Sequence, residues 1–126
     1  MDLKLNPDRD ISIDINNIDS ELRLYSPLFH RYLERKVRAE YNYELAREKH
    51  KDVSARISYE KKLSEVKITE KTLANYVQTH EDVQEAKQEE LMAKLKYEKI
   101  KAFCEAFRAK KDALVNLSAN QRIERG

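Results

Sequence analysis

Glycine is almost absent from this chain, because the only Gly among its 126 residues is Gly126. Glycine supplies tight turns and the phosphate-binding loops of nucleotide enzymes. The sequence therefore excludes a Gly-rich nucleotide loop and argues against β-sandwiches and doubly wound α/β folds, whose turns need Gly, Asn or Pro. With two Pro and 38% charged residues, the composition is typical of long helices and predicts an all-α fold.

Cysteine and long apolar runs are also scarce. Cys104 is the only cysteine, which excludes a disulfide framework. The sequence has no apolar run near 18 residues and no basic segment followed by an apolar core, patterns that mark membrane spans and signal peptides. We therefore expect a cytoplasmic protein with no membrane partner.

Charge alternates along the chain although 25 basic and 23 acidic residues nearly cancel. The basic and acidic counts are 3 and 6 in residues 1–28, 12 and 8 in 29–71, 1 and 5 in 72–92, and 9 and 4 in 93–126, giving net charges of −3, +4, −4 and +5. This segregation allows two basic helical surfaces. Such surfaces suit nucleic-acid binding and equally suit head-to-tail self-association.

Residues 1–18 differ from the rest of the chain. Pro7 and several Asn and Asp residues surround the alternating run Ile11-Ser12-Ile13-Asp14-Ile15, whose period of two predicts an extended arm or a short strand. Because an isolated strand cannot bury its own face, we expect this arm to pack on a helix or on a neighbouring subunit. We divide the chain into an N-terminal arm, 1–18, and one helical domain, 19–126.

A long helix is predicted from Asp19 onward, with Asn17 or Asp19 as its N-cap and a break or kink near Pro27. Spacings of three and four residues define a heptad seam along it. The seam consists of Leu22, Tyr25, Phe29, Tyr32, Lys36, Ala39, Tyr43, Ala46, His50, Val53, Ile57 and Glu60.

The heptad phase is lost over residues 61–79, which predicts the chain reversal there, with room for one short helix. Thr79-His80-Glu81-Asp82 then has the pattern of a helix start, with Thr79 as the cap. The final helix is expected to fray near 118–120. Its seam consists of Val83, Ala86, Ala93, Lys96, Ile100, Phe103, Phe107, Lys110, Leu114 and Leu117.

The expected fold is a hairpin of two long helices of about 35 residues, each extending about 50 Å. One helix pair covers only one stripe of each partner, and so small a chain is short of buried area. We therefore expect a helical homo-oligomer in which second apolar faces meet other subunits. These faces are marked by Leu33, Val37 and Leu45, and by Leu91, Leu95, Ala102 and Ala106.

No enzyme site is predicted. His30, His50 and His80 are not spaced four residues apart, and no Cys or carboxylate cluster completes a ligand set, so we expect no metal and no cofactor. Cys104 has no obvious partner base and is interpreted as a small apolar residue, buried or half-buried. We therefore expect no catalytic residue.

The basic stretch Arg47–Lys62 is the most informative part of the sequence. Arg35, Asn42, Lys49 and Arg56 are seven residues apart and so share a helix face, and Tyr59 lies one turn beyond Arg56. Cations contact phosphates while aromatic faces stack on unpaired bases, so this pattern suits a single strand. A solvated helix face without a ligand is the alternative interpretation.

Several short segments follow one another in a distinctive order along the chain. They are Asp10-Ile11-Ser12-Ile13-Asp14, Leu24-Tyr25-Ser26, Lys49 to Tyr59, Phe103-Cys104 and Gln121-Arg122. This order resembles the UvsY family of phage recombination mediators over most of the chain. In that family a stretch of the form Leu-Lys-Ala-Arg-Leu-x-Tyr-Tyr, at the end of the first long helix, contributes to single-stranded DNA binding. The equivalent here is Val53–Glu60, in which Arg56 and Tyr59 match while Ser54 replaces the Lys and Glu60 the second Tyr.

The resemblance implies a non-enzymatic mediator that forms a ring-like homo-oligomer through its C-terminal helix. It implies that the protein binds single-stranded DNA and helps a RecA-like recombinase displace single-strand-binding protein. The candidate DNA-binding residues are Lys49, Lys51, Arg56, Tyr59, Lys61, Lys62 and Arg35. The candidate oligomerisation residues are Ile100, Phe103, Phe107, Leu114 and Leu117. The alternative is a structural or adaptor coiled-coil protein, such as a scaffold or chaperone, whose oppositely charged segments pair between subunits.

Overall fold

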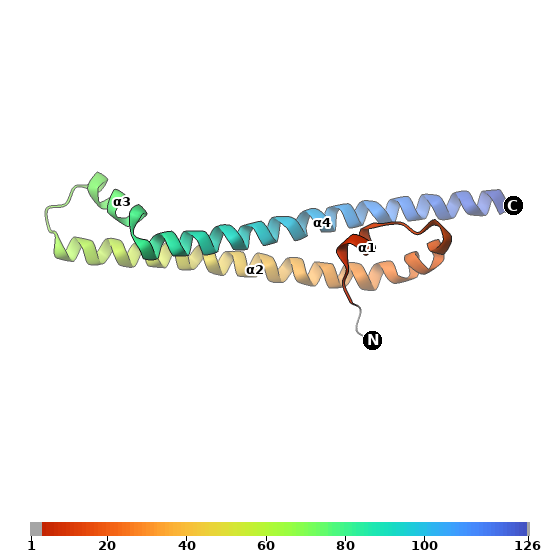
Figure 1. Cartoon of the computed structure of the whole chain (residues 1–126), viewed down its shortest axis with the longest axis horizontal. Coiled ribbons are helices and arrows are strands. Elements are labelled where there is room, and N and C mark those ends of the chain that lie inside the picture. The colour runs from red at the N-terminus through yellow and green to blue at the C-terminus, as the bar shows by residue number, and fades with distance from the viewer. Residues whose placement is uncertain (1–3, 126) are drawn as a thin grey trace. The chain divides into compact units, whose positions relative to one another are not determined.

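The structure, a computed structural model, describes residues 4–125. Within them the chain is all-helical, as expected, and contains no strand (Figure 1). None of the helices in this range combines the length and the apolar character that a membrane crossing requires. The elements are α1 (Pro7–Ile11), the 3₁₀ helix η1 (Ile15–Asn17), α2 (Ile18–Ser64), α3 (Glu70–Thr79) and α4 (Glu81–Arg125).

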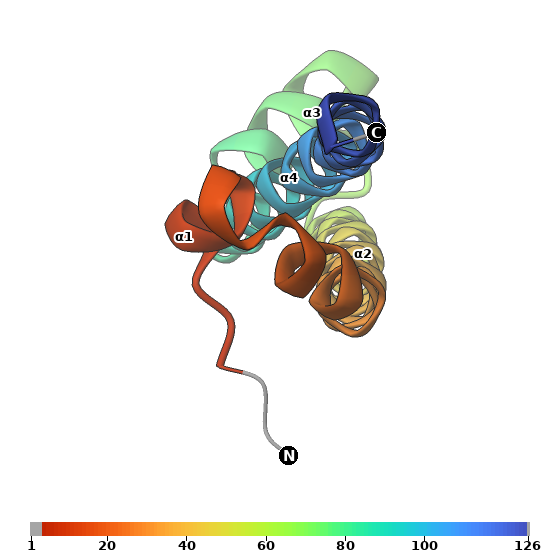
Figure 2. The same cartoon turned by 90° about the vertical axis from the view of Figure 1, so that its right-hand side faces the viewer.

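The chain divides into two compact units, and α2 and α4 contribute residues to both. Unit 1 contains the described residues 4–38 and 98–125, and unit 2 is Ala39–Tyr97. Unit 1 therefore holds α1, η1, the first part of α2 and the last part of α4, which Figure 2 shows from the end. Unit 2 holds the rest of α2, the whole of α3 and the beginning of α4.

Within each unit α2 and α4 pack side by side in opposite directions. In unit 1, Tyr25 stacks on Phe107 with ring centroids 4.6 Å apart, and Tyr32 contacts Phe103 at 4.4 Å. In unit 2, ion pairs join Lys49 to Glu89 and Arg56 to Asp82. Residue numbers therefore rise along α2 as they fall along α4, and the prediction that one long helix packs against another is confirmed.

Of the break or kink expected near Pro27, the break is absent, because α2 continues through this residue. Proline removes one backbone donor and crowds the preceding turn. However, Tyr25 is buried in the core of unit 1 and Leu28 packs against that core, so burial on both sides of Pro27 holds the helix together. The fraying expected near 118–120 is also absent, since α4 extends to Arg125.

The N-terminal arm was predicted to be extended or to form a short strand, and the strand is wrong. The arm forms α1 and η1, and the backbone between them is extended at Ser12 and Asp14. The Asn6 side chain accepts a hydrogen bond from the backbone N–H of Arg9 (3.2 Å), and Pro7 stands at the start of α1. These are helix-start signals, and Asp14 similarly caps η1. Local capping therefore decides the structure here. The period-two pattern of Ile11–Ile15 does not produce a strand, because the described residues contain no second strand with which it could pair.

The core of unit 1 is aromatic. Tyr25, Tyr32, Cys104 and Phe107 are buried together, and the Tyr25 hydroxyl donates to the backbone oxygen of Phe107 (2.9 Å). Burial raises the pKa of Tyr25 and of the Cys104 thiol, so this thiol stays protonated at neutral pH. The predicted seams include Tyr25, Tyr32 and Phe107 but not Cys104, and the seam residue Glu60 is exposed.

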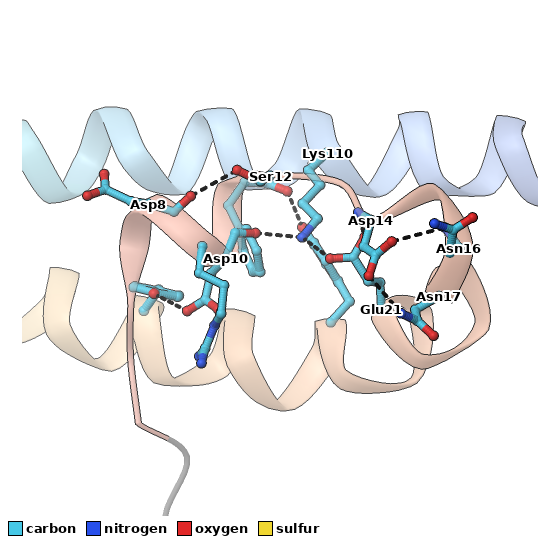
Figure 3. A network of polar contacts seen from close by, with 12 residues as sticks. Asp8, Asp10, Ser12, Asp14, Asn16, Asn17, Glu21 and Lys110 are labelled. Atoms are coloured by element: carbon cyan, nitrogen blue, oxygen red, sulfur yellow. Dashed lines mark hydrogen bonds and ion pairs between the residues drawn. The ribbon is translucent and has the colours of Figure 1, made fainter.

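A buried polar network fastens the arm to both long helices of unit 1 (Figure 3). Lys110 is a buried residue, 8% exposed. Its ammonium donates to the backbone oxygen of Asp10 (2.6 Å) and to Glu21 Oε1 (2.9 Å). The Tyr32 hydroxyl donates to Asp10 Oδ2 (2.5 Å). Burial, followed by this hydrogen bond, raises the pKa of Tyr32. The expectation that the arm packs on a helix is thus confirmed.

The predicted reversal contains the short helix α3. Thr69 caps it by accepting a hydrogen bond from the backbone N–H of Thr72 (3.2 Å). The cap of α4, however, is His80, whose Nδ1 accepts from the N–H of Asp82 (3.1 Å). Thr79 is instead the last residue of α3, and its hydroxyl donates to the backbone oxygen of Asn75 one turn earlier (2.7 Å).

Candidate nucleic-acid interface

The predicted DNA-binding residues divide between the two units. Arg35 belongs to unit 1, and the other six candidates belong to the part of α2 in unit 2. Glu, Lys, Arg and Ala, all good helix formers, dominate the stretch from Arg47 to Lys62. Its position on a helix therefore follows from local propensity as well as from packing.

Lys49 and Lys51 are exposed, and each pairs with a carboxylate of the same chain. Lys49 Nζ donates to Glu89 Oε2 of α4 at 2.8 Å, and this hydrogen bond raises the pKa of Lys49. Lys51 Nζ lies 3.7 Å from Glu48 Oε1. Any phosphate that binds these lysines must compete with these carboxylates.

Arg56 contacts two carboxylates. Its guanidinium nitrogens lie 3.5 Å from Glu60 Oε1 and 3.5 Å from Asp82 Oδ2, while its side chain remains 53% exposed. Glu60 stands where the UvsY-type motif has its second Tyr. Compared with that motif, this chain lacks an aromatic ring at position 60 and has a negative charge beside Arg56.

Lys61 is engaged by two neighbours. Its ammonium lies 2.7 Å from Glu65 Oε1, and this hydrogen bond raises the pKa of Lys61. The same ammonium lies 4.4 Å from the centroid of the Tyr76 ring. Lys61 therefore contributes to the packing of α3 against α2.

Tyr59 and Lys62 are the most available of the candidates in unit 2. The Tyr59 residue is 65% exposed. Lys62 is exposed, forms no ion pair within residues 4–125, and lines a groove of about 690 Å³ between α2 and α3. Because Arg56, Tyr59 and Lys62 are three residues apart on one helix, they lie on one side of it.

The paired cations are weakly held. Exposed ion pairs contribute about 0–1 kcal/mol, and each of the pairs made by Lys49, Lys51 and Arg56 involves two exposed residues. A strand that brings several phosphates together can displace such partners. The surface is chemically able to bind a single strand, but less strongly than the count of its cations suggests.

Arg35 is exposed and lies in unit 1, apart from the other candidates. It lines a groove of about 480 Å³ in unit 1 with three further cations, which sequence reasoning did not single out. Arg31 and Arg38 could have been found from the sequence, because they lie four residues before and three residues after Arg35 on the same helix. The residues lining this groove are Lys4, Leu5, Arg31, Glu34, Arg35 and Arg38.

The candidate oligomerisation residues lie on the face of α4 that packs inside unit 1. Phe107 and Leu114 are 0% exposed, so their side chains already have their partners within one chain. Ile100 and Phe103 pack against the same core, and Leu117 is half-buried. Their role between subunits stays a prediction. The expected second faces are more open, since Val37, Leu45, Leu91 and Leu95 are 46–66% exposed.

Other chemistry was sought in the same residues. No group of three or more His, Cys, Asp and Glu side chains in residues 4–125 is arranged to hold a metal ion. His50, which the seam pattern marked as a polar member, lies with its Nδ1 3.1 Å from Glu90 Oε2 on α4. In comparisons with known proteins, no family model, no curated protein and no solved structure matches this chain.

Proposed function

We propose that this chain is a non-enzymatic protein that binds single-stranded DNA and acts as a recombination mediator. The observation that carries the proposal is the exposed Tyr59 ring between Arg56 and Lys62 on one side of α2. Aromatic rings stack on unpaired bases and adjacent cations bind the phosphates. The mediator role, loading a RecA-like recombinase onto DNA covered by single-strand-binding protein, comes from the resemblance to the UvsY family.

Self-association would give this site useful strength. One stacked base contributes about 1–3 kcal/mol, which is too little to hold a strand. In a ring-like homo-oligomer each subunit presents the same surface, and binding at one subunit raises the effective concentration of the strand at the next. The exposed apolar residues of both long helices, such as Val37 and Leu91, support such an assembly.

The test is a titration of fluorescein-labelled oligothymidylate of about 20 nucleotides with the full chain. We expect the Arg56→Gln/Tyr59→Ala variant to bind about tenfold more weakly, because it loses a stacking ring and a phosphate contact. The matched control is Tyr41→Ala/Lys87→Gln, which removes a similarly exposed ring and one exposed lysine of unit 2. The proposal fails if the wild-type protein does not bind, or if both variants lose affinity equally.

Glu60→Gln gives a test of opposite sign. It removes one of the two carboxylates that contact Arg56, so we expect tighter binding of the same oligonucleotide. The mediator step itself is measured as the rate at which a RecA-like recombinase assembles on single-stranded DNA covered by single-strand-binding protein, with and without this chain. No acceleration would leave a binding protein that is not a mediator.

A structural coiled-coil protein is the second candidate, because the pairing of Lys49, Lys51 and Arg56 with carboxylates favours it. In that function the charges serve helix packing and subunit contacts only. Both candidates form oligomers, so light scattering does not separate them. Assembly without any oligonucleotide binding would favour the scaffold.

A further inference from the structure

A second cluster of cations, in unit 1, has a different character from the one in unit 2. The groove introduced above holds Arg31, Arg35 and Arg38 of α2 and Lys4 of the arm. We name these four residues and the space between them the arginine groove. Its volume is about 480 Å³.

Helix geometry and the folded arm build the groove together. Arg31, Arg35 and Arg38 are four and three residues apart, so α2 presents them on one side. Lys4 comes from the segment before α1, and its backbone oxygen accepts a hydrogen bond from the Arg9 guanidinium (3.0 Å). The segment that carries Lys4 is thereby tied to α1, which the Asp10 contacts attach to unit 1.

The cations of the arginine groove lack carboxylate partners. Within residues 4–125, Lys4, Arg31, Arg35 and Arg38 take part in no ion pair, whereas most of the cations predicted to bind DNA in unit 2 do. The single acid lining the groove is Glu34, whose Oε1 lies 2.7 Å from Nε2 of His30. Four positive groups and one negative group give the lining a formal charge of 4 − 1 = +3.

Without an anion, the like charges of this arrangement repel one another and slightly destabilise the helix. Like charges four residues apart on a helix destabilise it by a few tenths of a kcal/mol. Elsewhere α2 avoids this cost by placing a glutamate beside an arginine, as in Arg47–Glu44 and Arg56–Glu60. In the arginine groove the one glutamate, Glu34, lies three and four residues from Arg31 and Arg38 but contacts His30 instead. Most of the positive potential is therefore left for an external ligand.

The shape of the cluster selects the kind of anion. Guanidinium groups bind phosphate oxygens in a planar, two-pronged geometry. Arg31 to Arg38 spans about 10 Å along the helix axis, which favours a chain of phosphates over a single one. No aromatic residue lines the groove, so it offers no surface on which a base can stack, in contrast to Tyr59 in unit 2.

We propose that the arginine groove binds consecutive backbone phosphates of the nucleic-acid strand. This inference rests on the proposed function and adds a second contact site to it. Contacts to phosphates alone carry no sequence information and give affinity that falls with salt. The groove therefore adds phosphate contacts to the salt-dependent part of binding, while Tyr59 in unit 2 supplies stacking.

The experiment measures oligothymidylate affinity between about 50 and about 200 mM NaCl. Each phosphate contact to a single strand contributes about −0.7 to the slope of log K against log salt concentration. We expect Arg31→Gln/Arg35→Gln/Arg38→Gln to flatten the slope by about 2, the sum for three contacts. The control Lys71→Gln/Lys87→Gln/Lys111→Gln removes the same charge from exposed lysines, and should flatten it by less than about 0.7.

Two further measurements complete the test. Glu34→Gln removes the one acid of the groove, so it should tighten binding. In wild-type protein, inorganic tripolyphosphate should shift the NMR signals of the Arg31, Arg35 and Arg38 side-chain Nε–H groups. Glutamine is a good helix former, and unchanged circular dichroism will confirm that the variants remain folded.

The outcomes separate the two proposals. If the triple arginine variant keeps the wild-type slope while Arg56→Gln/Tyr59→Ala weakens binding, the arginine groove is overturned and the proposed function stands. Absent tripolyphosphate shifts likewise overturn the groove. If the wild-type protein does not bind the oligonucleotide, the proposed function fails, and with it the strand as the ligand of the groove.

Discussion

The two units are built from the same pair of helices but are held together differently. The largest fully buried side chains, Tyr32, Phe107 and Leu114, all belong to unit 1, where Lys110 is also buried. In unit 2 the buried residues are smaller, and exposed ion pairs such as Lys49–Glu89 join the helices. Burial contributes far more than exposed charge pairs. Unit 1 is therefore expected to be the stable part, and unit 2 the part whose side chains are free to exchange partners.

The largest expected effect is the loss of the central aromatic ring of unit 1. Phe107→Ala should lower the free energy of unfolding by about 3–5 kcal/mol, because Phe107 has no exposed surface and stacks on Tyr25. Urea unfolding followed by circular dichroism measures this. Val115→Ala, at a residue 46% exposed on the same helix, should cost less than about 1 kcal/mol; equal losses would contradict the contrast between core and surface.

The second effect concerns the buried network. Lys110→Ala removes the partner of Glu21 and of the Asp10 backbone oxygen, and should cost about 3 kcal/mol, because it leaves a partly buried carboxylate without its counter-charge. The adjacent Lys111 is exposed, so Lys111→Ala should change unfolding by less than about 0.5 kcal/mol. A small loss for Lys110→Ala would mean that the arm is not fastened through this ammonium.

The third effect depends on pH. The raised pKa of Tyr32 means that the folded protein keeps this proton at a pH where the unfolded chain loses it. Stability is therefore full below about pH 10 and falls above it, by at most about 1.4 kcal/mol per pH unit for this group. Tyr32→Phe should lower stability at neutral pH by about 1–2 kcal/mol and should make the decline above pH 10 shallower. An unchanged decline would rule out this contribution from Tyr32.

The smallest effect belongs to unit 2. A double-mutant cycle of Lys49→Ala and Glu89→Ala should give a coupling energy below about 1 kcal/mol, because both side chains are exposed. Near 0.5 M salt the coupling should become too small to measure. A larger coupling energy that persists at high salt would show that ion pairs stabilise unit 2 as strongly as the buried core stabilises unit 1.

The sequence was enough to predict which residues share a helix face, but not which residues of other segments they contact. Three-four spacing placed Tyr32, Phe107 and Lys110 on buried faces, because helix geometry alone fixes which residues share a face. The contact between Lys110 and Asp10 joins residues a hundred positions apart. It depends on how the arm folds, and the period-two pattern of the arm was misleading because capping decided its structure.

The same limit applies to the candidate site. The spacing of Arg56 and Tyr59 predicted a common face from α2 alone. The carboxylate of Asp82 beside Arg56 depends on the register between α2 and α4, which no feature of α2 determines. Arg35 was singled out from its seven-residue spacing, but Lys4 joins it in the arginine groove only because the arm folds back on α2.

The fastening of the arm has a practical consequence for anyone who shortens this chain. The few residues around Asp10 look dispensable, since they precede the long helices, although Leu5 and Ile11 pack against the core of unit 1. Cutting them away would remove the partner of a buried phenol and one of the two partners of a buried ammonium group. A fragment that starts at α2 should thus express as a looser, less soluble species.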